Sequence, residues 1–210
     1  MTNRRIIFFV NQKGGSGKST LAFNVAIAIS KNQNYKVALI DTDPQCSLYS
    51  IMEKREENNI KSNLYFATSF LNTLSAELKK CNDMDYIIVD TQGSASGDII
   101  QTCKNLNAKV IVPMLPNFLD IEATNPLLEI LIENHIEFKV LLNGIHHSGT
   151  NQVKFLKESL KEDNINTFDN YLIFRSIYKK PFFEGLSVVE IEDNVPVEFN
   201  NFMTETINWK

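Results

Sequence analysis

The sequence is poor in cysteine. Its 210 residues include three cysteines, at positions 46, 81 and 103, and none of them forms a Cys-x-x-Cys pair. Zinc, iron–sulfur and thioredoxin-type sites therefore have no support within one chain. An odd number of cysteines without a signal peptide favours a reducing compartment, so a cytoplasmic location is expected.

Long hydrophobic runs and an excess of basic residues are also missing. The apolar run after Arg5 is too short for the core of a signal peptide or for a membrane span. The net charge is −4, from 21 Lys and Arg against 25 Asp and Glu. Any nucleic-acid binding would have to come from a local basic patch. The apolar fraction of 43% and the charged fraction of 22% are typical of a globular protein and argue against disorder.

Short apolar runs alternate with helical segments along the chain. The pattern predicts strands at 5–11, 36–41, 86–90, 109–113, 138–143 and 171–175. It predicts helices at 18–31, around 71–78, and at 121–134, 152–163 and 203–209, with 53–63 as a solvated loop or frayed helix end. This alternation predicts an α/β fold with a twisted, mostly parallel sheet and helices on both faces. No repeat or linker divides the chain, so residues 1–210 are expected to form a single domain.

A glycine-rich segment between the first strand and the first helix carries the strongest chemical signal. It consists of Lys13, Gly14, Gly15, Ser16, Gly17, Lys18, Ser19 and Thr20. Glycines let backbone N–H groups turn inward around phosphate oxygens, and the start of the helix adds partial positive charge. Lys18 could reach the β- and γ-phosphates, the Ser19 hydroxyl could bind Mg²⁺, and Thr20 could contact the α-phosphate. The segment predicts a P-loop for a nucleoside triphosphate.

Lys13 is a second lysine inside this loop, and it leads to a family resemblance. Residues 13–20 resemble the deviant Walker A box of ParA/MinD-type ATPases. The sequence DTDPQ at 41–45 is similar to the second box of that family, and IIVDTQGS at 87–94 to its Walker B strand and second switch. Residues 113–120 and 174–190 resemble a proline-containing segment and the C-terminal segment of small plasmid-partition ParA proteins, the branch that includes ParF. The resemblance covers most of residues 5–190.

The resemblance implies roles for further residues. Strand periodicity places Asp41 and Asp43 on one face, where two carboxylates need a nearby cation. By resemblance, Asp90 holds Mg²⁺ together with Ser19, Asp41 supports the metal side, and Asp43 orients the attacking water. Lys13 would reach the ATP of a partner subunit, so that Lys13, Lys18 and Asp43 form the catalytic set. Asn143, at a predicted strand end, resembles the asparagine that contacts adenine.

The same resemblance implies an activity and partners. The chain is expected to form an ATP-dependent homodimer, which could extend into a polymer. It is expected to hydrolyse Mg²⁺–ATP to ADP slowly, and a centromere-binding partner of the ParB or ParG type would stimulate it. The ATP-bound form would bind DNA without sequence preference and associate with the nucleoid. Two basic groups are candidates for the DNA contacts, with solvated surface lysines as the other interpretation. They are Lys154, Lys157 and Lys161, and Arg175, Lys179 and Lys180.

Other functions remain open. A MinD-like protein would bind membrane through a basic amphipathic C-terminal helix, but residues 197–210 carry Glu198, Glu205 and one lysine, so no membrane binding is expected. The ATPase could instead position a protein cargo, or the chain could be a metabolic P-loop enzyme such as a small-molecule synthetase. A pure binding module would hold Mg²⁺–ATP without turning it over. No helix-turn-helix domain fits before residue 5, and His146 and His147 are expected to be an exposed loop pair.

Overall fold

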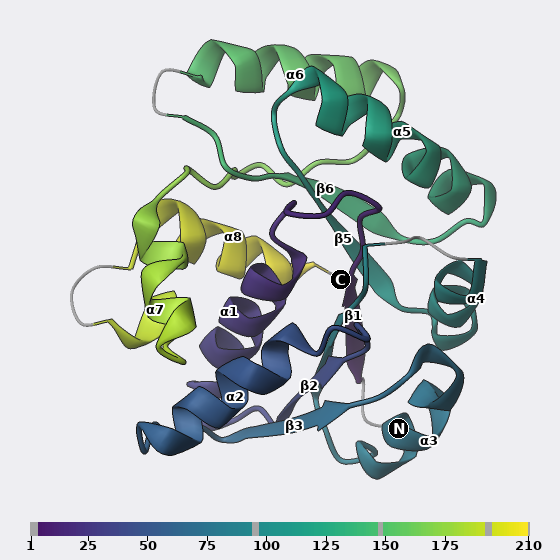
Figure 1. Ribbon diagram of the computed structural model, residues 1–210. Coiled ribbons are helices and arrows are strands. Elements are labelled where there is room, and N and C mark those ends of the chain that lie inside the picture. Colours follow the sequence, from purple (N-terminus) through teal and green to yellow (C-terminus); the bar gives the residue numbers. More distant parts are fainter. Residues whose placement is uncertain (1–3, 94–96, 147–148, 192–194, 210) are drawn as a thin grey trace.

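The computed structural model describes residues 4–93, 97–146, 149–191 and 195–209 (Figure 1). Its centre is a sheet of parallel strands in the order β3-β2-β4-β1-β5-β6. The strands are β1 (Arg5–Phe9), β2 (Val37–Asp41), β3 (Leu64–Thr68), β4 (Tyr86–Asp90), β5 (Lys109–Met114) and β6 (Phe138–Leu142). The predicted α/β class with a parallel sheet is confirmed.

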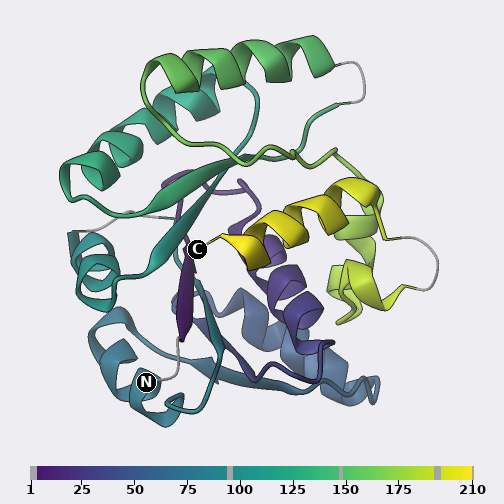
Figure 2. The same ribbon diagram turned by 180° about the vertical axis from the view of Figure 1, so that it is seen from behind.

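Helices cover both faces of the sheet (Figures 1 and 2). They are α1 (Lys18–Ser30), α2 (Ser47–Glu57), α3 (Leu74–Lys80), α4 (Gly97–Leu106), α5 (Phe118–Glu133), α6 (Thr150–Glu162), α7 (Lys180–Phe183) and α8 (Val197–Asn208). Short 3₁₀ turns lie at Leu71–Thr73, Ser176–Tyr178 and Val188–Glu190. No helix in the described ranges combines the length and apolar character that crossing a bilayer requires.

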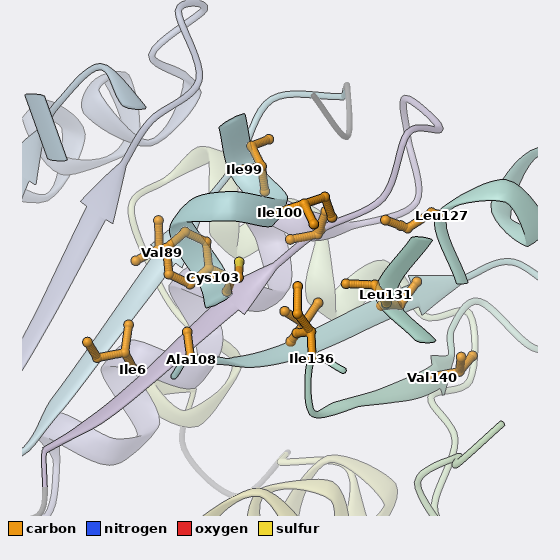
Figure 3. Close-up of a cluster of buried hydrophobic side chains, with 14 of the residues drawn as sticks. Ile6, Val89, Ile99, Ile100, Cys103, Ala108, Leu127, Leu131, Ile136 and Val140 are labelled. Carbon is orange, nitrogen blue, oxygen red and sulfur yellow. The ribbon is translucent and has the colours of Figure 1, made fainter. Parts of the chain in front are cut away.

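Alternate residues of each strand build two separate cores. In β1, Ile6 and Phe8 face the layer of α3, α4, α5 and α6, whereas Ile7 and Phe9 face the layer of α1, α2, α7 and α8. Figure 3 shows part of the first core, where Cys103 of α4 lies among aliphatic side chains. Because both faces are covered, the central strands are apolar almost throughout, which explains why the sequence revealed them.

Several predicted boundaries differ from the structure. Residues 47–57 form α2, and β3 and α4 occupy residues for which no element was predicted. The predicted strand at 171–175 is wrong: the described chain makes only an isolated bridge there, between Ile145 and Ile173. Strand β6 ends at Leu142, and Leu172 bonds across its end to the carbonyl of Leu142 and the amide of Ile145. The segment at 171–175 therefore lacks a continuous partner.

Three helices begin earlier than their apolar spacing indicates, among them α6, which starts at Thr150 rather than 152. The structure starts α5 at Phe118 rather than 121, after Asn117 accepts a hydrogen bond from the amide of Asp120. It starts α8 at Val197 rather than 203. Pro126 lies inside α5 without ending it. The first turn of α5 exposes Phe118 and Leu119, so it lacks the buried spacing by which the rest of that helix was predicted.

Candidate functional site

The predicted site residues gather at the carboxyl ends of β1, β2, β4 and β6 and at the start of α1 (Figure 1). Residues 10–17 connect β1 to α1, while Asp41 and Asp90 end β2 and β4. Strand β1 lies between β4 and β5. The chain leads from β1 toward β2 on one side, and later crosses from β4 to β5 on the other side, so the strand order reverses direction at β1. A crevice outside such a switch point is where open α/β sheets bind ligands.

The glycine-rich loop owes its shape to left-handed backbone positions. Gly15 has a φ of 80° and Gly17 a φ of 98°, both in the region that glycine adopts without strain. A Cβ on Gly17 would also lie 2.5 Å from Nδ2 of Asn143. That nitrogen donates to the carbonyl of Ser16 at 2.8 Å and ties the loop to the end of β6. Gly17 provides no side-chain cap to α1, so the first amides of the helix remain available to an anion.

The two lysines of the loop have different environments. Lys18 is buried, and its ammonium donates to the carbonyl of Lys13 at 3.3 Å. Burial lowers the pKa of Lys18, while the nearby carboxylates of Asp90 and Asp43 oppose that change. The Lys13 side chain is exposed. Lys18 is therefore directed into the site, and Lys13 lies on its rim.

Asn11 supports the loop from below, a role that the sequence analysis did not assign. Its Oδ1 accepts from the backbone amide of Lys13 at 2.9 Å. Its Nδ2 donates to the carbonyl of Pro113 at 2.6 Å and to the hydroxyl of Thr124 at 3.2 Å. The residue is fully buried. A polar side chain directly after an apolar strand was the signal that could have identified it.

Asp90 has a deeply buried carboxylate. It is 0% exposed, and neither carboxylate oxygen is hydrogen-bonded to a residue within the described ranges, although the Ser19 hydroxyl lies close enough to favour the charged form. Burial raises the pKa of Asp90 to about 7, against the effects of Ser19 and Lys18. An acceptor-only group in this position suits a hard cation such as Mg²⁺.

Protein groups alone do not complete a metal site here. Within the described residues there is no cluster of three His, Cys, Asp or Glu side chains placed to hold a metal ion. Mg²⁺ commonly takes one or two protein oxygens and completes its shell with water and substrate phosphates. Asp90 and Ser19 beside a phosphate loop fit that mode of binding.

Asp41 and Asp43 bind backbone amides. Asp41 is 1% exposed, and its two oxygens accept from the amides of Asp43 and Leu48, each at 3.0 Å. Burial raises the pKa of Asp41, although these amides favour its charged form. Asp43 is half-buried and accepts from the amide of Gln45 at 2.9 Å. The structure thus brings both residues to the site, with Asp41 also anchoring the first turn of α2.

A pocket of about 390 Å³ adjoins the loop. Asn143 and Gly17 line its inner end, and aromatic residues line its outer wall. The His146 ring lies 5.6 Å from the Phe174 ring, centre to centre, with 34° between the planes. His146 is exposed, as predicted, but its part in this wall was not foreseen; His147 lies outside the described residues. The pocket is large enough for a nucleoside next to the phosphate loop.

The candidate DNA-contacting residues occupy different settings. On α6, Lys154 and Lys161 are exposed, while Lys157 donates to the carbonyl of Asp169 at 2.6 Å. Arg175 lies 2.7 Å from a carboxylate oxygen of Glu198. Both Arg175 and Lys179 line the pocket beside the phosphate loop. The side chain of Lys180 lies outside the described part of the structure.

Comparisons with known proteins agree with this geometry. A sequence profile described as the CobQ/CobB/MinD/ParA nucleotide binding domain matches residues 7–164. Maintenance of carboxysome distribution protein A from Gloeobacter kilaueensis is 23% identical over 89% of this chain and 84% of its own length. The protein of the same name from Halothiobacillus neapolitanus is 22% identical over 94% of each chain.

Solved structures share the whole fold. A putative plasmid partition protein from Borrelia burgdorferi B31, bound to AMPPNP, superimposes with a TM-score of 0.77 at 21% identity, covering 99% of this chain and 100% of the other. MinD cell division protein from Aquifex aeolicus gives a TM-score of 0.74 at 19% identity, covering 98% and 97%. With the deviant phosphate loop and the profile match over most of the chain, the resemblance is confirmed: the protein belongs to the CobQ/CobB/MinD/ParA family of nucleotide-binding domains.

Proposed function

We propose that the protein is a Mg²⁺-dependent ATPase that dimerises on binding ATP and partitions DNA. The observation that carries this proposal is the pair of lysines in the phosphate loop. Lys18 is buried toward Asp90, whereas Lys13 stands exposed on the rim. One lysine suffices to bind the phosphates within a chain. An exposed second lysine on the same loop suits contact with the nucleotide of a facing subunit.

The orientation of Asn143 supports adenine as the base. Its Nδ2 is committed to the Ser16 carbonyl, so Oδ1 is the atom that it can offer to a ligand in the pocket. This acceptor suits the exocyclic amine of adenine and repels the carbonyl oxygen that guanine carries at the equivalent ring position. We expect ATP to bind more tightly than GTP.

The remaining groups have separate roles around the phosphates. Ser19 and Asp90 would hold Mg²⁺, with Asp41 supporting that side, and the ion would supply positive charge at the phosphate oxygens. Lys18 neutralises phosphate charge from within the loop. Asp43, half-buried just after β2, would orient the attacking water molecule. Because these groups mainly position charge, turnover is expected to be slow until a partner protein adds to the site.

Replacing Lys13 tests the dimer. Lys13→Ala should bind ATP within about threefold of the parent, because Lys18 and the loop amides remain, and should lose at least about tenfold in turnover. Size-exclusion chromatography with light scattering in the presence of AMPPNP should show a monomer for Lys13→Ala. It should show a dimer for the parent and for the control Lys79→Ala, whose lysine is exposed on α3. A Lys13→Ala protein with full stimulated turnover and an ATP-dependent dimer would contradict the proposal.

DNA as the cargo is tested by nucleotide-dependent binding. A dimer doubles the phosphate contacts made by exposed lysines, and affinity rises steeply with that number. At fixed salt, the anisotropy of a labelled random duplex should rise with ATP but not with ADP or without nucleotide. The double variant Lys154→Ala/Lys161→Ala should weaken binding, whereas Lys79→Ala should not. If the parent binds ATP but no DNA in any state, the DNA cargo is excluded. DNA binding by the ATP form would also support nucleoid association, and stimulation of ATP turnover by a centromere-binding protein would be a separate test.

A protein cargo is the second candidate function. It is favoured by two relatives of matching length that are named for carboxysome distribution. The chain would then use the same nucleotide cycle to position a protein assembly. Absence of DNA binding together with ATP-dependent dimerisation would favour this function.

The structure gives no support to a membrane-bound, MinD-like mode. The apolar face of α8 is packed into the core, with Phe199 and Phe202 fully buried. Its acidic residues are engaged by the fold, since Glu198 pairs with Arg175 and Glu205 accepts from the amides of Asp169 and Asn170. We expect no sedimentation with anionic phospholipid vesicles in the presence of ATP.

A further inference from the structure

Arg55 is a buried cation near the end of α2, away from the phosphate loop. It is 1% exposed. Its guanidinium donates to the carbonyl of Gly185 at 2.6 Å and to the two carboxylate oxygens of Glu190 at 2.6 and 2.8 Å. It also lies over the ring of Phe23, 5.6 Å from the ring centre. Arg55 therefore joins α2 to both α1 and the C-terminal segment.

A second set of hydrogen bonds connects the same C-terminal segment to the phosphate-loop helix. Glu190 accepts from the amide of Ser187 at 2.9 Å. The hydroxyl of Ser187 and the amide of Val188 both donate to Oδ1 of Asn24, at 2.8 and 2.7 Å. Nδ2 of Asn24 donates to the carbonyl of Thr20, a phosphate-loop residue, at 2.7 Å. Buried and partly buried hydrogen bonds thus run from Thr20 through residues 187–190 to α2.

Helix α2 depends on few anchors. Only Leu48, Ile51 and Arg55 of this helix are buried. At its first turn, the amide of Leu48 is held by Asp41. Near its end, a Cβ on Gly185 would lie 2.8 Å from the backbone nitrogen of Arg55, so the two backbones are in close contact. Removing the Arg55 contacts would leave the far end of α2 held by the partly buried Met52 and by an exposed hydrogen bond from Asn58 to the carbonyl of Glu184.

A buried ion pair is a poor source of net stability, because the desolvation of both charges offsets their attraction. Its contribution is a fixed geometry, since the guanidinium and carboxylate meet through two parallel hydrogen bonds. The element fixed here is the helix that directly follows the turn bearing Asp43.

We propose that Arg55, with Glu190, is a positioning residue that fixes α2 and through it the Asp43 turn relative to the phosphate loop. The significance for turnover rests on the proposed function, in which Asp43 orients water. Phe174, Arg175, Tyr178 and Lys179 line the proposed nucleoside pocket, and the chain continues from them to residues 185–190. The C-terminal segment therefore links the nucleoside end of the site to its Asp43 end.

The test combines amide exchange with kinetics, using Arg55→Lys and Glu190→Gln. Both keep most of the side-chain volume and lose the paired hydrogen bonds. The matched control is Lys54→Gln, which breaks the exposed Lys54–Glu57 pair one residue away on the same helix. Circular dichroism establishes that each variant is folded. Hydrogen exchange of the peptide spanning residues 43–50 is measured without nucleotide, and ATP affinity and turnover are measured separately.

We expect exchange in this peptide to be at least tenfold faster in the two test variants and unchanged in Lys54→Gln. ATP turnover should fall at least tenfold while ATP affinity stays within threefold, a division that general destabilisation would not produce. Folded Arg55→Lys and Glu190→Gln proteins with parental exchange would overturn the positioning role. If the parent chain itself does not hydrolyse ATP, the proposed function fails, while the exchange result still decides whether Arg55 positions the turn.

Discussion

Two neighbouring strands each end in an aspartate, and the two carboxylates differ in their hydrogen bonding. Asp41 and Asp90 are paired in register across β2 and β4, both are buried, and burial raises the pKa of both. The two oxygens of Asp41 each accept from a backbone amide, whereas neither oxygen of Asp90 is hydrogen-bonded to any residue that the structure describes. One carboxylate thus anchors the following helix, and the other remains available to a ligand.

The largest expected effect separates the two residues in catalysis. Asp90→Asn should lower ATP turnover by about 10³-fold or more, because the metal contributes several kcal/mol to the stabilisation of phosphoryl charge. Asp41→Asn should cost only about tenfold, since its amide oxygen can still accept one of the two backbone bonds. Phosphate release at saturating Mg²⁺–ATP measures both. Equal losses of ATP turnover in the two variants would show that Asp41 and Asp90 contribute equally to catalysis.

The next effect is a pH dependence of stability in the nucleotide-free chain. Asp90 has a pKa of about 7 when folded, against about 3.9 when unfolded. Between these values the folded state binds more protons, so the free energy of unfolding falls as pH rises from about 4 to 7. The shift corresponds to a decline of up to about 4 kcal/mol. Urea unfolding from pH 5 to 8 should show a steeper decline for the parent than for Asp90→Asn. If the free energy of unfolding depends on pH in the same way for the parent and for Asp90→Asn, the raised pKa of Asp90 is contradicted.

A smaller effect concerns Asp41 as the residue that anchors the first turn of α2. At pH 8, Asp41→Asn should lower the free energy of unfolding by about 1–2 kcal/mol, because one buried backbone amide loses its acceptor. Exchange of the Leu48 amide should accelerate at the same time. Glu53→Gln, on the exposed side of α2, is the control and should change neither quantity. Unaltered Leu48 exchange in Asp41→Asn would show that the helix does not depend on this carboxylate.

The smallest effect tests whether the two strand ends act together. The hydroxyl of Thr42 donates to the carbonyl of Asp90 at 2.7 Å, and the amide of Thr42 donates to the same atom. Thr42→Val should cost about 1 kcal/mol of stability and leave turnover within twofold, because the amide bond remains. Thr91→Val, which loses a bond to the carbonyl of Phe9, is the matched comparison. A tenfold loss of turnover in Thr42→Val alone would mean that the ends are coupled.

Sequence reasoning succeeded where local spacing encodes the structure. The phosphate loop has glycines at positions that require left-handed backbone, and the central strands are apolar because helices cover both faces. Edge strand β3 escaped prediction because it is only half-buried. Helix α4 was missed although its sequence is amphipathic, with Ile99, Ile100 and Cys103 as its buried residues at helical spacing.

The parts that could not be predicted depend on distant partners. Arg55 reads as a surface residue in a charged stretch, yet its partner Glu190 is 135 positions away. Arg175 and Lys157 were candidates for a DNA surface, but Glu198 and the carbonyl of Asp169 engage them. The DNA-contact assignments stay predictions, with Lys154, Lys161 and Lys179 as the more exposed members.

The position of β1 in the sheet has a consequence for how the chain folds. Arg5–Phe9 is synthesised well before its two neighbours in the sheet, Tyr86–Asp90 and Lys109–Met114. During synthesis this apolar strand has no sheet partner until roughly a hundred further residues have been added, which takes on the order of ten seconds at ribosomal speed. The phosphate loop, which depends on β1 for its placement, is therefore completed late. Parallel pairing over such separations folds slowly and exposes strand edges meanwhile, so the nascent chain is a natural client for chaperones.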